Sequence, residues 1–132
     1  MRIFIDTNVL ISAFVFGGTS GVLMEKLLMS SHELLVSEYI DEEFKQKLFQ
    51  KWPKKAELAY DLYRTLPIHL CRSSSQMEGV LRDPKDIPVL SDALYNGADV
   101  ILTGDKDFLE AQLEKPLVLS PTLLLDFLNS KI

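Results

Sequence analysis

The sequence predicts an α/β fold in which helices cover both faces of a parallel sheet, and residues 1–132 are expected to form one domain. Short apolar runs of strand length alternate along the chain with segments whose apolar residues recur at helical spacing. Parallel strands need such helical crossovers between them, so this alternation favours a parallel sheet. The length and the apolar fraction of 47% suit a single compact core.

The amino-terminal part is expected to hold two strands and two helices. Residues 3–5 form a short β-prone run, and the polar residues 6–8 behind it are suited to begin a helix. The Gly-Gly-Thr-Ser run at residues 17–20 breaks this helix before a second one, which covers the apolar stretch 22–28. Residues 33–36 give the next strand.

The alternation continues through the rest of the chain. A helix begins at Ser37 and ends before Pro53, because its apolar residues share one face and a proline cannot continue it. A second helix begins at Asp86 and ends at Gly97, with Ile87, Leu90 and Leu94 expected to face inward. The other expected elements are a helix at 54–65, strands at 67–71, 100–103 and 117–119, a short helix around Phe108, and a helix from Pro121.

Composition excludes several classes of protein. One cysteine, Cys71, allows neither an internal disulfide nor a multi-cysteine zinc site, and it is interpreted as a small, semi-buried apolar residue. A net charge of -5 disfavours general nucleic-acid binding unless the acids hold cations. No apolar run approaches the ~18 residues of a membrane span. A cytoplasmic protein without a membrane partner is expected.

Two acidic residues follow predicted strands at the point where each strand ends. Asp6 follows the first strand, and Asp105 follows the strand at residues 100–103. Ligands of open parallel sheets bind beyond the carboxyl ends of the strands, so these two acids are the main candidates for function. Each acid could instead serve only as a helix cap, because each also precedes a helix.

Two further acids are expected at the same edge of the sheet. Asp86 begins the helix that leads into the strand at 100–103. Glu43 lies one turn into the helix that starts at Ser37, nearer its apolar face than Glu42, which is expected to face solvent. The remaining acids of the later segment are interpreted as turn formers, caps or solvated charges: Asp83, Asp92, Asp99 and Asp107.

Four carboxylates in one pocket repel one another and raise each other's pKa values unless cations neutralise them. Oxygen ligands favour Mg²⁺ or Mn²⁺ over zinc, and no His or Cys stands at metal-ligand spacing. The isolated His32 and His69 are interpreted as structural. Bound ions of this kind activate water against a phosphodiester and stabilise the leaving oxygen. The acids therefore predict phosphodiester hydrolysis.

Four segments make the sequence resemble the PIN-domain family. They are FIDTNVL at residues 4–10, SEYIDEE at 37–43, RDPKD at 82–86 and ADVILTGDKD at 98–107. The match is best with a bacterial and archaeal branch whose members are toxin components of toxin–antitoxin pairs. A lone Asp-Thr-Asn is a weak signal, but the ordered set is specific.

The resemblance implies a sheet of four or five parallel strands and cleavage of single-stranded RNA with Mg²⁺ or Mn²⁺. It also implies a homodimer and a cognate antitoxin protein. The residues that it implies as catalytic and metal-binding are Asp6, Glu43, Asp86 and Asp105, with Asp107 as an optional fifth metal ligand, and Asn8 and Thr103 as supporting residues.

One basic stretch surrounds the chain's one tryptophan. Lys51, Lys54 and Lys55 could contact phosphates while Trp52 stacks on a base. The alternative is a solvated helix face with Trp52 packed inward.

Two other functions compete with the nuclease. A phosphatase of the haloacid-dehalogenase type also has an Asp after its first strand, but it needs a second Asp two residues later, where this chain has Asn8. The second alternative is a PIN-like module that binds RNA or protein without catalysis. Such a module would use some of these acids only as helix caps.

Overall fold

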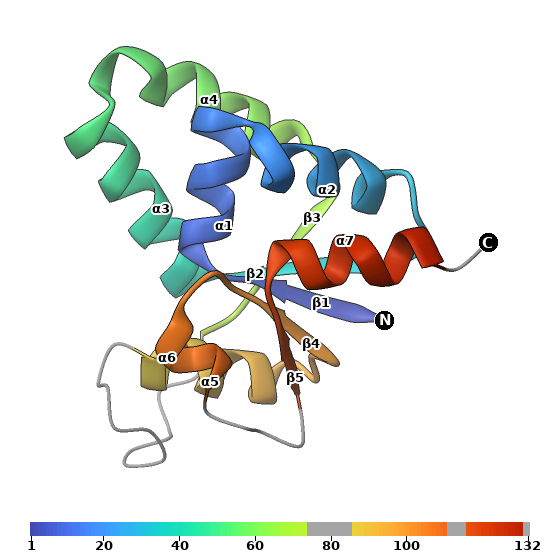
Figure 1. The fold of residues 1–132 in the computed structure, drawn as a ribbon. Helices are drawn as coiled ribbons and strands as arrows, with labels where there is room; N and C mark the ends of the chain where they lie inside the picture. Colours follow the sequence, from blue (N-terminus) through green and yellow to red (C-terminus); the bar gives the residue numbers. More distant parts are fainter. Residues whose placement is uncertain (74–85, 111–115, 131–132) are drawn as a thin grey trace.

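The computed structural model describes residues 1–73, 86–110 and 116–130. Its centre is a five-stranded sheet in the order β3-β2-β1-β4-β5 (Figure 1). Every neighbouring pair of strands is parallel. The predicted class of fold is therefore confirmed, with the larger of the two expected numbers of strands.

The elements follow the predicted alternation closely. The strands are β1 (Arg2–Ile5), β2 (Glu33–Ser37), β3 (Ile68–Cys71), β4 (Val100–Leu102) and β5 (Leu117–Leu119). The helices are α1 (Thr7–Ile11), the π-helical turn η1 (Ser12–Phe16), α2 (Gly18–Leu28), α3 (Glu38–Lys51), α4 (Pro53–Thr65), α5 (Asp86–Tyr95), α6 (Lys106–Leu109) and α7 (Pro121–Ser130).

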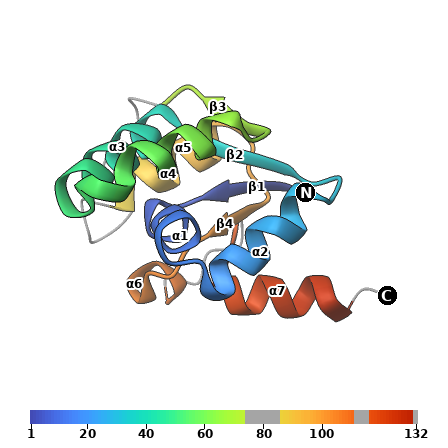
Figure 2. The ribbon, with the colours of Figure 1, turned by 90° about the horizontal axis from the view of Figure 1, so that it is seen from above.

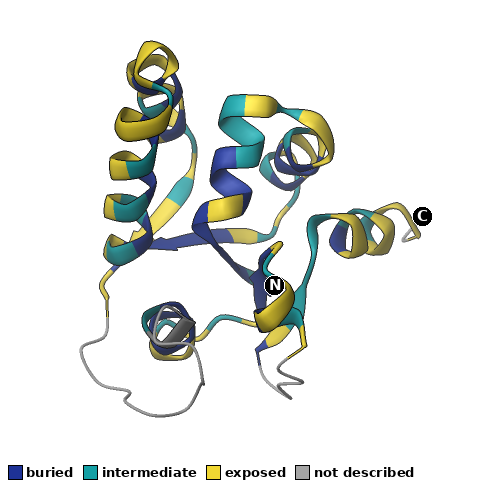
Figure 3. Cartoon of the chain, turned by 60° about the vertical axis from the view of Figure 1, so that its left-hand side comes forward, coloured by how far each residue is buried: buried dark blue, intermediate teal, exposed yellow. Residues whose placement is uncertain are grey.

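Helices cover both faces of the sheet. Helices α1–α4 lie on one face, α5 and α6 lie on the other, and α7 packs beside α2 (Figure 1, Figure 2). The central strands are consequently buried on both sides: Ile3, Phe4 and Ile5 of β1 have no exposed surface, and all of β4 is buried (Figure 3). Continuous apolar strands of this kind are typical of parallel sheets.

The order in which the chain adds strands to the sheet reverses at β1, and this reversal determines where a ligand can bind. From β1 the chain proceeds to β2 and β3 on one side, whereas β4 and β5 lie on the other side. The loops that leave β1 and β4 therefore diverge at their carboxyl ends, and the space between these two loops is named the crevice of the sheet. In open α/β sheets ligands bind at such a switch point.

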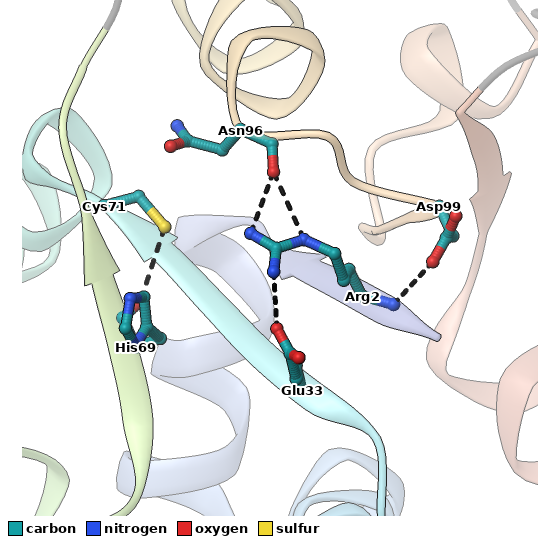
Figure 4. A network of polar contacts seen from close by, with 6 residues as sticks. All are labelled: Arg2, Glu33, His69, Cys71, Asn96 and Asp99. Atoms are coloured by element: carbon teal, nitrogen blue, oxygen red, sulfur yellow. Dashed lines mark hydrogen bonds and ion pairs between the residues drawn. The ribbon is translucent and has the colours of Figure 1, made fainter.

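The opposite edge of the sheet is held by Arg2 (Figure 4). Its guanidinium donates to the Asn96 carbonyl at 2.9 Å and to the Glu33 carboxylate at 2.5 Å, and its backbone N–H donates to Asp99 at 2.7 Å. These bonds connect β1 to β2 and to the turn before β4. The Arg2–Glu33 pair is well exposed, so it contributes little to stability by itself. Asp99 has the local structural role predicted for it.

One predicted helix face needs correction. In α5 the prediction that Leu94 faces inward is wrong, because Leu94 is 40% exposed, while Val89, Leu90 and Ala93 are buried. The side chain of Ile87 lies outside the described residues. Asp92 is also misinterpreted as a solvated or capping acid, since it is only 1% exposed. This face is set by the contact of α5 with α3 and by the packing of Val89, Leu90 and Ala93 in the core, and apolar spacing alone did not determine it.

The first helix also differs from the prediction. It continues as a π-helical turn, η1, and α2 begins already at Gly18, within the run that was expected to be a break. Gly17 has a φ of 80°, which a glycine adopts without steric cost. This residue makes the sharp change of direction between η1 and α2.

No single helix among the described residues is long and apolar enough to cross a membrane. The helical segments Thr7–Phe16 and Gly18–Leu28 pass that test only together, as a pair bent by 100°.

Candidate active site

Asp6 lies at the carboxyl end of β1, in the crevice beside β4. Its backbone N–H donates to the Leu102 carbonyl at 2.9 Å, which extends the pairing of β1 with β4 by one residue. Its carboxylate caps α1 by accepting the Thr7 N–H at 2.8 Å. The residue is only 8% exposed, so this cap is also a buried charge.

Thr103 connects the two strand ends. Its hydroxyl donates to the second carboxylate oxygen of Asp6 at 2.7 Å and accepts the backbone N–H of Asp105 at 3.1 Å. Asp105 in turn caps α6 by accepting the Asp107 N–H at 2.9 Å. Thr103 is completely buried. One hydroxyl thus fixes Asp6 relative to the loop that carries Asp105 and Asp107.

Glu43 reaches the same edge from α3. Helix α3 begins where the Ser37 side chain accepts the Ile40 N–H, and Glu43 is half-buried while Glu42 is exposed, as predicted. The Thr7 hydroxyl donates a short hydrogen bond to a Glu43 carboxylate oxygen. Thr7 is 1% exposed, so α1 holds the Glu43 carboxylate from inside the protein.

Sequence reasoning selected Asn8 as the supporting residue of this helix and did not assign a role to Thr7. Asn8 is exposed, and the side chain in α1 that contacts Glu43 belongs to Thr7. The sequence signal that could have identified Thr7 is its position directly after the capping acid Asp6, where a hydroxyl can face the same edge of the sheet as the acid. Whether it does so depends on how α1 packs on α3.

The electrostatics of Asp6 differ from those of an ordinary helix cap. Burial raises the pKa of Asp6 above its usual value of 3.8, and the negative charges of Glu43 and Asp105 raise this pKa further. The hydrogen bonds from Thr103 and Thr7 lower this pKa, but burial is the largest single influence and the net shift is upward. The Asp6 carboxylate therefore lies in a field that disfavours its ionised form.

Tyr39 is a neighbour of the acids that sequence reasoning missed. Burial raises the pKa of its phenol, and the charges of Glu43, Asp6 and Asp92 act in the same direction. Its phenol therefore lies within electrostatic range of all three acids. Asp92 brings a further buried carboxylate to this region from α5.

The position of Asp86 agrees with the prediction at the level of the backbone. Asp86 is the first residue of α5, and α5 contacts α3. Because α5 runs back toward the amino end of β4, its first residue lies on the carboxyl side of the sheet. The side chain of Asp86 lies outside the described residues. Asp107 is exposed in the first turn of α6.

The donor set fits a divalent cation by its chemistry. Asp6, Glu43 and Asp105 supply only oxygen atoms, which Mg²⁺ and Mn²⁺ prefer. The one ion pair between described residues is Arg2–Glu33, at the other edge of the sheet, so no described cationic side chain neutralises these acids. Among the described residues, however, no three acid, histidine or cysteine side chains lie close enough to one another to hold one metal ion.

The basic stretch lies at the turn between α3 and α4. Trp52 separates the two helices, and it is half-buried and packed partly against the core. Its ring makes an edge-to-face contact with Phe16, with ring centroids 5.5 Å apart. Lys51, Lys54 and Lys55 are all exposed. Trp52 is thus neither fully inward nor fully solvated.

The remaining predicted structural residues are accounted for. Cys71 is buried, which raises the pKa of its thiol, and its sulfur contacts the His69 carbonyl at 3.8 Å. His32 Nδ1 lies 2.9 Å from the amino-terminal nitrogen. Among the described residues, the Asp6 carboxylate accepts hydrogen bonds from Thr7 and Thr103 and from neither histidine.

These observations place the protein among the parallel α/β proteins that carry acids at the carboxyl ends of the strands, where the order of strands reverses. The sequence matches the model of the PIN domain over residues 2–107. This chain therefore belongs to the PIN-domain family. The resemblance inferred from the four segments is confirmed, and the family match does not favour the phosphatase alternative.

Solved structures that share the fold include the following two. One is VapBC2 from Rickettsia felis bound to a DNA fragment from their promoter, with 14% identity, a TM-score of 0.70, and coverage of 91% of this chain and 98% of that one. The other is VapC20 of Mycobacterium tuberculosis, a sarcin-ricin loop cleaving toxin, with 14% identity, a TM-score of 0.62, and coverage of 85% and 96%. No curated protein matches the sequence.

Proposed function

We propose that this protein is a metal-dependent endoribonuclease that hydrolyses phosphodiester bonds of single-stranded RNA. The observation that carries the proposal is the state of Asp6. It is a buried carboxylate whose pKa is raised by burial and by two neighbouring acids, with no described cationic side chain to neutralise it. A divalent cation between these acids would remove the repulsion.

The residues proposed to hold Mg²⁺ or Mn²⁺ are Asp6, Glu43, Asp86 and Asp105, with Asp107 as an optional ligand. When bound, such ions supply a water of lowered pKa and neutralise charge on the scissile phosphate. Thr103 and Thr7 are proposed as positioning residues, because their hydroxyls fix the Asp6 and Glu43 carboxylates. Asn8 stays a predicted supporting residue at the exposed side of α1.

Cleavage of a labelled single-stranded RNA tests the proposal. Purified protein is assayed with Mg²⁺, with Mn²⁺ and with EDTA, beside Asp6→Asn and the control Asp126→Asn. Asp126 is an exposed acid on α7, so the control makes the same chemical change away from the crevice. We expect metal-dependent cleavage that Asp126→Asn retains and Asp6→Asn loses.

Equal cleavage by the parent protein and Asp6→Asn would mean that a contaminating nuclease acts and would reject the assignment of Asp6. Absence of cleavage by the parent protein with either metal, together with RNA affinity that Asp6→Asn leaves unchanged, would favour the non-catalytic module. One set of proteins thus distinguishes the nuclease from the non-catalytic binding module.

We also propose that the protein is the toxin of a toxin–antitoxin pair. The support is its likeness in fold to VapBC2 and a groove of about 440 Å³ between η1, α2 and α4, which suits an apolar segment of a VapB-type antitoxin. Val22→Glu and Leu62→Glu introduce charge into this groove. Each should abolish co-purification with a co-expressed antitoxin, whereas Leu58→Glu, at an exposed site of α4 outside the groove, should not.

A homodimer stays a prediction. Light scattering during size-exclusion chromatography would measure the mass of the purified protein against the 15.0 kDa of one chain. A mass of one chain at all concentrations would reject the dimer.

A further inference from the structure

Two aromatic rings meet at the surface where η1 approaches the turn between α3 and α4. Phe16 is 66% exposed and Trp52 is half-buried. Their rings contact each other edge to face, at an interplanar angle of 86°. An exposed phenylalanine that packs on a tryptophan is costly to leave in water, so this pair marks a candidate binding surface.

The local structure explains why Phe16 points outward. Phe14, two residues earlier, packs inward against Phe44 and Tyr63. Phe16 closes the π-helical turn, immediately before the change of direction at Gly17. Single π-helical turns inside helices are frequent at functional sites. The turn holds Phe16 against Trp52 instead of in the core.

The charge around this pair differs from that of the rest of the chain. Residues 45–55 contain five of the 14 Lys and Arg residues and none of the 19 Asp and Glu residues. Lys51, Lys54 and Lys55 are exposed, and none of them forms an ion pair with a residue that the structure describes. Unpaired lysines beside exposed aromatic rings are the combination that binds single-stranded nucleic acid.

Helix α3 links this surface to the crevice. Glu43 and Trp52 are nine residues apart, which corresponds to about 13–14 Å along the helix axis at about 1.5 Å per residue. A stacked nucleic-acid strand rises about 3.4 Å per nucleotide, so about four nucleotides span this distance, and fewer do so in an extended strand. One short RNA can therefore reach both places.

We propose that Phe16 and Trp52 form a stacking platform for an unpaired base of single-stranded RNA, with Lys51, Lys54 and Lys55 around it to bind the flanking phosphates. The inference rests on the proposed nuclease function and adds where the substrate binds outside the crevice. Unstacked bases in single strands expose the faces that aromatic rings bind, whereas paired bases do not. The platform therefore selects single strands over duplex.

The chain's one tryptophan allows a direct test, because Trp52 is the only indole that can report. The titration uses Asp6→Asn protein, so that RNA stays intact, and follows Trp52 fluorescence with a short single-stranded RNA and with an abasic oligomer of equal length. We expect quenching by the RNA and little change with the abasic oligomer. Equal responses to both would overturn the platform.

Phe16→Ala in the same background removes one ring and keeps the reporter. A stacked base contributes about 1–3 kcal/mol, which is about a 5- to 150-fold loss of RNA affinity at about 1.4 kcal/mol per tenfold. Tyr95→Ala is the matched control, because Tyr95 is 67% exposed on α5, and it should leave the affinity unchanged. Equal affinity of Phe16→Ala and its parent would overturn the proposal.

Lysine variants test the phosphate contacts. Lys54→Gln and Lys55→Gln should each flatten the dependence of affinity on salt, whereas Lys26→Gln, on α2, should not. Identical salt dependence in all three would overturn the lysine assignment.

The two proposals fail in different ways. If the parent protein cleaves RNA with metal and Asp6→Asn does not, but Phe16→Ala cleaves and binds normally, the platform is rejected and the nuclease stands. If no cleavage occurs but RNA quenches Trp52 and Phe16→Ala weakens binding, the platform stands and the nuclease is rejected.

Discussion

Thr103→Val tests whether one buried hydroxyl holds the site together. Valine has nearly the shape of threonine, so the change removes the hydroxyl without leaving a large cavity. The Asp6 carboxylate then loses a 2.7 Å donor, and the Asp105 N–H loses its acceptor. Both groups lie at the carboxyl edge of β1 and β4, where Thr103 has no exposed surface.

The size of the effect follows from the charge on Asp6. A hydrogen bond to a charged group contributes about 1.5–3 kcal/mol, and a neutral one about 0.5–1.5 kcal/mol. We expect the free energy of unfolding to fall by about 2–4.5 kcal/mol in metal-free protein at neutral pH, because both hydrogen bonds are lost. For 132 residues, with an unfolding entropy of about 2.1 cal/mol/K per residue, this corresponds to a decrease in Tm of about 7–16 °C.

The loss should depend on pH in a defined direction. The Thr103 hydroxyl stabilises the ionised form of Asp6, so its removal raises the Asp6 pKa further above 3.8. The hydrogen bond from Thr103 to the ionised Asp6 carboxylate exists only above the pKa that Asp6 has in the folded protein. The destabilisation should therefore be complete at neutral pH and decrease as the pH falls through the folded pKa of Asp6, where the carboxyl is protonated in both proteins.

Urea unfolding with EDTA at a series of pH values measures this dependence. Thr103→Ser keeps the hydroxyl and should recover most of the stability. Thr65→Val changes an exposed threonine whose hydroxyl donates to the Leu62 carbonyl, and it controls for the substitution itself. A Thr103→Val penalty below about 0.5 kcal/mol, or one that stays constant with pH, would show that this hydroxyl does not stabilise the ionised Asp6 carboxylate.

Three further changes have defined outcomes. Asp6→Asn should raise the Tm of the metal-free protein at neutral pH, because burial raises the pKa of the Asp6 carboxyl and asparagine caps a helix equally well. Below pH 3.8 it should give no gain, since the carboxyl is then protonated in the folded and the unfolded protein. A large drop in Tm at neutral pH would contradict this expectation. Thr7→Val should lower kcat by releasing Glu43, and Thr7→Ser should restore it; equal kcat in both would exclude the role. Phe44→Ala should cost about 3–5 kcal/mol in urea unfolding, since Phe44 is buried among aromatic rings; a cost under about 1 kcal/mol would reject that packing.

Local patterns were sufficient to predict the fold because each element carries its own signal. The apolar run at β4 and the cap at Ser37 depend on residues a few positions apart, and both are confirmed. Right-handed helical crossovers narrow the possible orders of the strands, but the order β3-β2-β1-β4-β5 itself was not predicted. Asp6 and Asp105 could be placed at one edge because parallel strands end on the same side of a sheet.

Contacts between distant segments could not be predicted in this way. Thr7 reaches Glu43 across 36 positions, and Thr103 reaches Asp6 across 97. Leu94 and Asp92 in α5 were misplaced, because the face that a helix buries depends on its packing partners as well as on its own periodicity.

The alternation of elements, the family and the acids that lie at the strand ends could be read from the order of residues. The hydroxyls that hold those acids, the burial of Asp6 and the contact between Phe16 and Trp52 became known from the folded structure alone. The physical reason is that periodicity and capping act over a few residues. Burial, pKa shifts and ring contacts depend on the rotation and approach of whole helices, which are set by the packing of the complete core.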